Sequence, residues 1–315
     1  MDIYIDETNL KSFLGQKSNP LFYDCMKLLK KQLNIRFNFS KQVLKDNKDL
    51  FPIVNLLASG VGNTVTSFDN SFPDRPLKSN STNGFNSEQL SSVYWLDDED
   101  ISKTIDSGGV IVSKVGKEIT SIEQLFFHQE DYLFEKKWRI GNADFSKWED
   151  LRKFSMPLTD IVFIDNYILS SKEIIECNIK DYLRVLLNQS YSKVNLVLFV
   201  HPDKIDGDIE EYRKDLKALV KAETGKASNV SIVQTRKEHD RTIITNYKRV
   251  YTGDTFNFWD NAGRKITKGR EIEYSSFLRT ENDKLKKALI NDLQDIINKN
   301  PENIIGDKLS NYLKF

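Results

Sequence analysis

Residues 237–247 read Lys-Glu-His-Asp-Arg-Thr-Ile-Ile-Thr-Asn-Tyr, a short β-like run with polar residues at both ends. His239, one of three histidines in the chain, stands at the start of this run, and Arg241 follows two residues later. Alternate residues of a strand point to the same face, so we expect the two side chains on one side. Histidine serves as a nucleophile or general acid, and arginine holds phosphate oxygens bidentately. The pair therefore predicts a site that handles phosphate.

The sequence around this run predicts an α/β domain. Buried strands are expected over 160–169, 194–200, 229–234 and 240–246, with helices over 171–187 and 207–223. Strands that alternate with helices are typical of layered α/β domains in which neighbouring strands are parallel. A long helix is expected after residue 276, either as an intramolecular brace or as a surface for a protein partner.

The first half also predicts an α/β domain. Strands are expected over 2–6, 35–39, 92–96 and 109–115, and helices over 20–33, 41–58 and 121–136. Residues 67–90 are rich in Ser, Asn, Asp and Pro without periodicity, which predicts a long loop. We expect two domains, a Rossmann-like domain over 1–150 and a second α/β domain over 151–315.

Composition limits the classes of function. Lys plus Arg and Asp plus Glu balance at 46 each, so no overall positive charge marks a nucleic-acid binder. Residues 234–270, however, hold nine basic residues against four acidic ones, a local net charge of +5. A solvated face and a surface for anions both remain open. The two cysteines lack metal-site spacing, and neither a signal peptide nor a membrane-length apolar run is present, so we expect a cytoplasmic protein without membrane contact.

The spacing H-x-R-x4-N-x6-G is formed by His239, Arg241, Asn246 and Gly253. It resembles the signature of the phospholipase D superfamily, H-x-K-x4-D-x6-G-[ST], with Arg in place of Lys, Asn in place of Asp, and Asp254 after the glycine. The run 164–169 also resembles the strand that precedes the first helix of such domains. The resemblance covers about residues 157–262 and implies a phospholipase-D-like half domain, followed here by the long C-terminal helix.

The resemblance also implies roles for individual residues. His239 would attack phosphorus, Arg241 would clamp the phosphate, and Asn246 stands where the family has an aspartate. An amide does not stabilise an imidazolium as a carboxylate does, and no second motif is present, so a two-histidine site would need a homodimer. The residues expected to bind substrate are Tyr167, Asn166, Arg236, Lys237, Lys248 and Gly253. An active hydrolase, a phosphate-binding relic and a strand with satisfied polar ends all remain open.

Acidic residues in the first half offer a second kind of site. Asp6 follows the opening strand, and Asp97 begins an acidic run after a later strand. Ligands gather at the carboxyl ends of strands in open α/β sheets, and carboxylates suit Mg²⁺ or Mn²⁺. The opening Ile-Tyr-Ile-Asp-Glu resembles PIN-like and other Rossmann-like nucleases. Solvated acids at strand ends are the alternative, and we expect no cofactor unless these acids bind a metal.

The sequence thus predicts a nucleic-acid-directed phosphodiesterase or nuclease-like protein. The resemblance to the phospholipase D superfamily further implies a role in prokaryotic antiviral defence. The alternative is a non-catalytic regulatory or effector subunit. It would bind nucleic acid through a degenerate motif, or a protein partner through the C-terminal helix.

Overall fold

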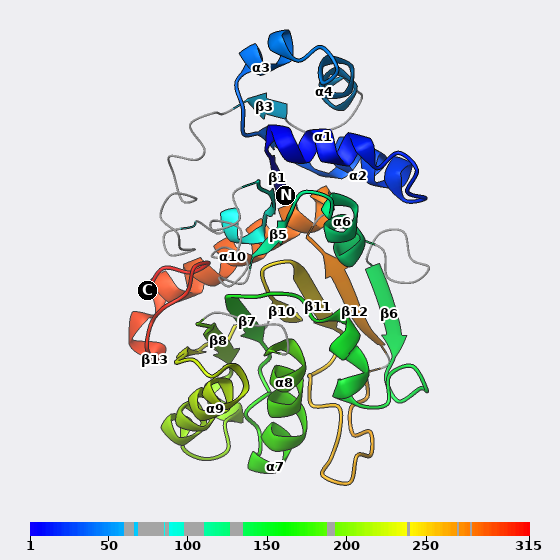
Figure 1. The fold of residues 1–315 in the computed structure, drawn as a ribbon. Coiled ribbons are helices and arrows are strands. Elements are labelled where there is room, and N and C mark those ends of the chain that lie inside the picture. The colour runs from blue at the N-terminus through cyan, green and yellow to red at the C-terminus, as the bar shows by residue number, and fades with distance from the viewer. Residues whose placement is uncertain are drawn as a thin grey trace. The chain divides into compact units, whose positions relative to one another are not determined.

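The computed structural model describes residues 1–59, 66–68, 85, 88–97, 110–126, 135–187, 193–237, 240–269, 271–277 and 279–315. The chain divides into two compact units. Unit 1 comprises Met1–Phe134 and Ser276–Asp283, and unit 2 comprises Glu135–Ser275 and Lys284–Phe315. Each unit combines helices with a sheet, which confirms the predicted α/β class (Figure 1).

The division between the units falls near residue 135 and not near the expected residue 150. The cause is β6 (Glu135–Arg139), which pairs antiparallel with β12 (Glu271–Ser276). Through this pairing, backbone hydrogen bonds join β6 to the sheet of unit 2, and the segment that follows β6 belongs to that unit as well.

Unit 1 contains a parallel sheet in the order β3-β2-β1-β4-β5. Its strands are β1 (Asp2–Ile5), β2 (Asn34–Phe37), β3 (Thr66–Phe68), β4 (Val93–Trp95) and β5 (Ile111–Ser113). Its helices include α1 (Glu7–Gly15), α2 (Phe22–Gln32), α3 (Lys41–Asp46), α4 (Phe51–Ala58) and α6 (Glu118–Phe126). This strand order is the one found in doubly wound Rossmann-like sheets.

The central strand of unit 1 is buried on both faces, which explains why apolar residues occupy successive positions in it. Tyr4 stacks on Tyr94 with ring centroids 4.9 Å apart. Trp95 lies 5.2 Å from Phe13, and its indole nitrogen donates to Ser121 Oγ. Aromatic packing from β1, β4 and the helices therefore fixes the ends of β1 and β4 beside each other.

Unit 2 contains a mixed sheet in the order β13-β9-β8-β7-β10-β11-β12-β6. The strands not yet given are β7 (Asp160–Ile164), β8 (Asn195–Val200), β9 (Asn229–Gln234), β10 (Arg241–Ile244), β11 (Lys248–Thr252) and β13 (Ile304–Gly306). The helical segments include η4 (Trp148–Phe154), α7 (Lys172–Ile174), the π-helix η5 (Ile175–Lys180), α8 (Asp181–Leu187), η6 (Pro202–Lys204), α9 (Ile209–Thr224) and α10 (Thr280–Lys299).

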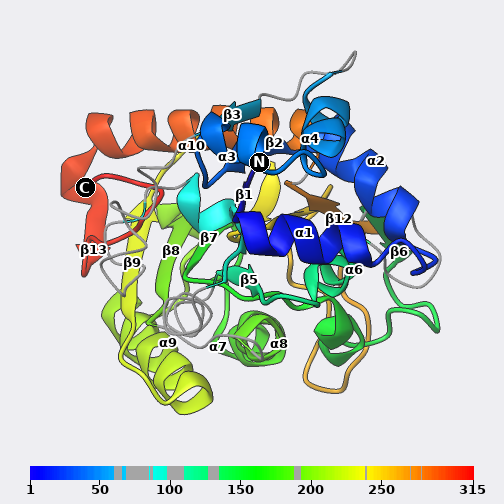
Figure 2. The same cartoon turned by 45° about the horizontal axis from the view of Figure 1, so that its top comes forward.

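Strands β7, β8 and β9 are parallel, with α8 and α9 on one side of them (Figure 2). The expectation of parallel neighbours is wrong for β10, which pairs antiparallel with β7. Only residues 235–240 link β9 to β10. A parallel crossover needs a dozen or more residues, so this short link has no room for one. The chain instead returns in the opposite direction and continues into a hairpin with β11.

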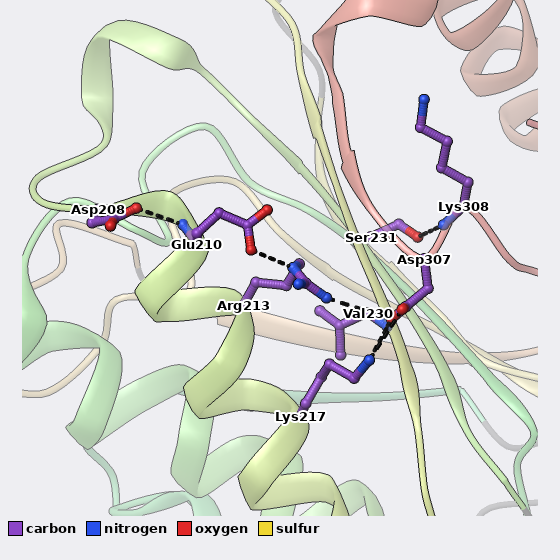
Figure 3. Close-up of polar contacts among 8 residues, drawn as sticks. All are labelled: Asp208, Glu210, Arg213, Lys217, Val230, Ser231, Asp307 and Lys308. Carbon is purple, nitrogen blue, oxygen red and sulfur yellow. Dashed lines mark hydrogen bonds and ion pairs between the residues drawn. The ribbon is translucent and has the colours of Figure 1, made fainter.

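The edge strand β13 is held by side chains of α9, as Figure 3 shows. Asp307, directly after β13, accepts from Lys217 Nζ at 2.9 Å and from the amide of Val230 in β9 at 2.8 Å. Arg213 lies 3.7 Å from the same carboxylate.

The C-terminal helix contacts the residues that follow it. Gln294 of α10 exchanges two hydrogen bonds with the backbone of Lys314. The role of the C-terminal helix, as a brace or as a partner surface, stays a prediction.

Within the part of the chain that the structure describes, no helix has both the length and the apolar character needed to cross a membrane.

Candidate nucleic-acid interface

Polar residues gather where the three parallel strands of unit 2 end. Asp165 to Tyr167 follow β7, His201 to Lys204 follow β8, and Thr235 to Lys237 follow β9. The strand ends are level, since Asp165 N donates to Phe199 O and Thr235 N donates to Val200 O. This edge is where α/β sheets bind ligands.

Arg241 lies at this same edge because β10 runs antiparallel to β7. Its neighbour Thr242 pairs with Ile164, the last residue of β7. Arg241 itself pairs with Thr252, the last residue of β11. The sheet therefore places Arg241 beside Tyr167, at an edge that also carries Asn166 and, three strands away, Arg236 and Lys237.

Tyr167 forms the centre of the interface. Its side chain is an exposed aromatic, with 37% of the residue accessible. The Arg241 guanidinium lies 5.8 Å from the ring centroid, and the Lys204 ammonium lies 5.7 Å from it. Cations at this distance are attracted by the ring quadrupole. Two positive charges, one from β10 and one from η6, thus lie near one exposed aromatic ring.

A hydrogen bond from the backbone of Tyr167 to Asp165 holds Tyr167 in place. The Asp165 carboxylate accepts from the Tyr167 amide at 2.9 Å, from Thr255 Oγ1 at 2.7 Å and from the Phe256 amide at 2.6 Å. Asn257 completes the attachment, because its Nδ2 donates to Tyr167 O at 2.6 Å. The turn after β7 and the loop after β11 are therefore locked together.

The environment of Asp165 also changes its acidity. Complete burial raises the pKa of this carboxyl to about 6. The hydrogen bonds from Tyr167, Phe256 and Thr255 and the charge of Arg241 lower the pKa, but they offset the burial only in part. The Asp165 carboxyl, which holds the Tyr167 backbone, therefore changes its charge near pH 6.

Arg241 keeps unused hydrogen-bonding capacity. Its Nε is buried and has no acceptor among the described residues. A guanidinium carries five N–H donors and does not lose its proton in proteins. The side chain is thus positively charged, and one of its donors has no acceptor among the described residues.

His201 and Lys204 belong to the interface although sequence reasoning did not select them. His201 Nδ1 accepts from the Asp203 amide at 3.2 Å, so its neutral ring carries the proton on Nε2. Asp203 in turn holds Arg236 through two hydrogen bonds of 2.6 and 2.9 Å. The signal available in the sequence was the position of His201 directly after a buried strand.

Asn246 is not brought to Arg241. It lies beyond the far end of β10, about 15 Å along the strand. Its buried Oδ1 accepts from the Thr159 amide at 2.9 Å and from the Asp160 amide at 3.3 Å. Asn246 thus accepts from backbone amides at the amino end of β7. The expectation that it lies in one site with Arg241 is wrong.

Lys248 is not available to steer a polyanion, in contrast to the expectation. It is buried, its Nζ donates to Phe154 O, and it lies 5.4 Å from the Tyr274 ring. Burial lowers its pKa well below the usual value. The reason is register: Lys248 shares a face of β11 with the buried Val250 and Thr252.

Gly253 and His239 are the remaining residues of unit 2 that the sequence predicted for the site. Gly253 follows Thr252, the cross-strand partner of Arg241, and lines a pocket of about 560 Å³. His239 lies outside the described residues, so its role stays a prediction from the sequence.

Unit 1 brings Asp6 and Asp97 together. They follow β1 and β4, and the Asp97 amide donates to Asp6 Oδ2 at 2.9 Å. Asp6 Oδ1 accepts from Asn38 Nδ2 at 2.5 Å, whereas Asn38 Oδ1 is buried without a donor among the described residues. These oxygens suit a hard cation such as Mg²⁺. The described residues contain no group of three or more His, Cys, Asp or Glu placed to hold a metal, and the acids at 98–100 lie outside them.

Comparison with known proteins gives little further information. No family model and no curated protein matches the chain. The archaeal chromatin protein TrmBL2, described as showing a novel mode of DNA binding, matches with a TM-score of 0.26 and 11% identity, over 49% of this chain and 51% of that one. Phosphatidylserine synthase from Haemophilus influenzae Rd KW20, a phospholipase-D-like protein, matches with a TM-score of 0.29 and 13% identity, over 64% and 48%. The chain thus spans about half the length of these neighbours, and both likenesses are too weak to indicate a function.

Proposed function

We propose that this chain is a nucleic-acid-directed phosphodiesterase-like protein whose unit 2 binds a nucleic-acid strand at the carboxyl ends of β7, β8 and β9. The observation that carries the proposal is the exposed Tyr167 ring with the Lys204 and Arg241 charges over it. Aromatic rings beside Lys and Arg are the elements with which proteins bind single strands without reading their sequence.

The charges favour a polyanion over a single small anion. Arg241, Lys204, Arg236 and Lys237 come from segments that follow or begin three different strands, so their charges are spread along the edge. Arg236 is partly neutralised by Asp203, which leaves Lys204 and Arg241 as the principal phosphate ligands. A backbone with regularly spaced phosphates matches this arrangement.

Binding of a fluorescent single-stranded oligonucleotide to the full chain tests the proposal. We expect Lys204→Ala and Tyr167→Ala each to weaken binding about tenfold, since stacking and phosphate contacts contribute ~1–3 kcal/mol per base or charge. Lys214→Ala, which removes an exposed lysine of α9, is the matched control and should leave the affinity unchanged. Equal affinity in all four proteins would exclude this edge as the binding site.

A second candidate places phosphodiester cleavage in unit 1. The observation that favours it is the meeting of Asp6 and Asp97 at the point where the order of the parallel sheet reverses, between β1 and β4. Asp6 and Asn38 would hold a divalent cation there, and such an ion activates water and stabilises the developing charge on phosphate.

Two substitutions separate the catalytic alternatives. Cleavage that needs Mg²⁺ or Mn²⁺, and a rise in melting temperature with the metal that Asp6→Asn abolishes, would support the site in unit 1. Cleavage that continues in EDTA but is lost in His239→Ala would support the histidine predicted from the sequence. Binding without any cleavage would support the non-catalytic alternative. The homodimer and the role in antiviral defence stay predictions from the sequence.

A further inference from the structure

A pocket of about 560 Å³ opens at the same sheet edge in unit 2. Strands β6, β11 and β12 form it, together with the turns that follow β11 and precede β12. Its lining residues are Lys137, Tyr251, Gly253, Asp254, Lys268, Gly269, Glu271 and Glu273. Pockets that bind small ligands have volumes of ~300–1,000 Å³, so this one has the size for a ligand of moderate dimensions.

The walls of the pocket are held in place by the protein. Asp254 Oδ2 accepts from Thr267 Oγ1 at 2.9 Å and from the amides of Lys268 and Gly269 at 3.1 Å. The Arg249 guanidinium lies 4.7 Å from the Tyr251 ring and supports it. The pocket is therefore formed before a ligand arrives.

The side chains of the pocket offer three kinds of interaction. Tyr251 provides an aromatic ring, and Lys137 and Lys268 provide positive charge. Glu271 and Glu273 project from the same face of β12, and Lys137 Nζ lies 2.9 Å from Glu273. A matching ligand would have a planar ring to stack, N–H groups to donate to a carboxylate, and an anionic group for the lysines.

We infer that this pocket binds one nucleotide whose base carries an exocyclic amino group, with the base against Tyr251 and its N–H donors on Glu271 or Glu273. Carboxylates accept from base amino groups, and guanine presents two adjacent donors to one carboxylate. The phosphate lies toward Lys268, since Lys137 is already paired with Glu273. Uracil, which lacks an amino group, is the weakest ligand of the series.

The position of the pocket joins it to the strand-binding edge, and in this respect the inference rests on the proposed function. Arg241 pairs directly with Thr252, and Gly253 of the pocket is the next residue. Paired Cα atoms lie about 5 Å apart and successive ones about 3.8 Å, so Gly253 lies within roughly 10 Å of Arg241. A phosphate on Arg241 and a base in the pocket therefore fit neighbouring parts of one strand.

Gly253 provides a direct means of filling the pocket. A Cβ atom added to it would meet no atom within 4 Å, and its backbone does not adopt a positive φ. Gly253→Leu should therefore place a side chain in the pocket without strain. Gly15 in unit 1 has the same freedom, so Gly15→Leu is the matched control.

Titration calorimetry of the full chain with GMP, CMP and UMP tests the inference. We expect GMP to bind at least tenfold more tightly than UMP, and CMP to lie between them. Gly253→Leu should weaken GMP binding at least tenfold, whereas Gly15→Leu should not change it. Glu271→Gln should reduce the preference for GMP over UMP, with the exposed Glu302→Gln as its control.

The outcomes distinguish this inference from the proposed function. Equal binding of GMP and UMP, or GMP binding that survives Gly253→Leu, would overturn the inference. Binding of free arginine or glycine in place of all nucleotides would also overturn it. If an oligonucleotide binds in a manner that depends on Lys204 but no mononucleotide binds, the inference fails and the proposed function stands. If GMP binds as expected but no oligonucleotide does, the proposed function fails and the nucleotide pocket stands.

Discussion

The two ends of the parallel strands in unit 2 are both rich in polar residues, but they differ in what those residues contact. At the amino ends, Asp160, Asn195 and Asn229 stand in register on β7, β8 and β9 and are hydrogen-bonded in a row. Asn311 and Asn246 close this row by bonding to Asp160. At the carboxyl ends, Lys204 and Arg241 lie over an exposed ring. The difference teaches that polar groups bonded to one another hold a fold, whereas charges left at the surface mark a place for a ligand.

The largest expected effect is at the amino ends. Asp160→Ala would remove a buried carboxylate that accepts from Asn195, Ser310 and Asn311. We expect a loss of about 3–5 kcal/mol in the free energy of unfolding, because several buried donors would lose their acceptor. Urea denaturation measures it, with the exposed Asp49→Ala as control. A loss below 1 kcal/mol would show that this end does not hold the fold.

The second largest expected effect is the pH dependence of the contribution of Asp165 to the free energy of unfolding. Its folded-state pKa of about 6 lies above the ordinary 3.8, so the native state binds more protons between these values. The contribution of Asp165 to stability therefore falls as the pH rises from about 4 to about 6 and is constant above that range. The difference in unfolding free energy between the wild type and Asp165→Asn should fall by at most about 3 kcal/mol over this range.

Two outcomes would contradict this prediction. A difference that rises with pH would mean that Arg241 and the hydrogen bonds outweigh burial. A difference that stays constant would mean that Asp165 does not titrate in this range. Denaturation of the two proteins at pH 4, 5, 6 and 7 distinguishes these cases, because the other carboxyl groups cancel in the difference.

Asn246 tests the difference between the two ends of the strands. The sequence motif groups it with Arg241, whereas the structure places it at the amino end of β7. Asn246→Ala would leave the Thr159 amide without its acceptor and should cost ~1–3 kcal/mol of stability. Oligonucleotide affinity of the folded variant, measured at a temperature where it remains native, should be unchanged. A tenfold loss of affinity with normal stability would instead return Asn246 to the binding site.

The smallest effect concerns the salt dependence of binding. Each phosphate contact contributes about one to the slope of log affinity against log salt concentration. Lys204→Ala should lower this slope by about one. Arg236→Ala should lower it by less, since Asp203 already holds that guanidinium. Equal changes would indicate that the Arg236–Asp203 pair opens when the strand binds.

Local patterns in the sequence predicted many elements correctly. The strand at Asn229–Gln234 has the predicted bounds. The helix expected over 171–187 begins at Lys172, and Ser171 caps it by accepting from Ile174 N. Hydrophobic runs and capping residues act over a few positions, so they can be read directly. The π-helix within that helix was not predicted. It places Asn178 to accept from the Phe258 and Trp259 amides, contacts about 80 residues away.

The sequence by itself determined the α/β class and many of the strands. It also placed Arg241 among the candidates through its spacing from His239, and Tyr167 through the family resemblance of residues 164–169. Only the tertiary structure decided which candidates meet. The antiparallel return of β10 brings Arg241 beside Tyr167 and carries Asn246 to the far end, while the register of β11 buries Lys248. The physical reason is that spacing along a strand fixes a side chain's face, whereas strand direction and partner fix which distant residues it contacts.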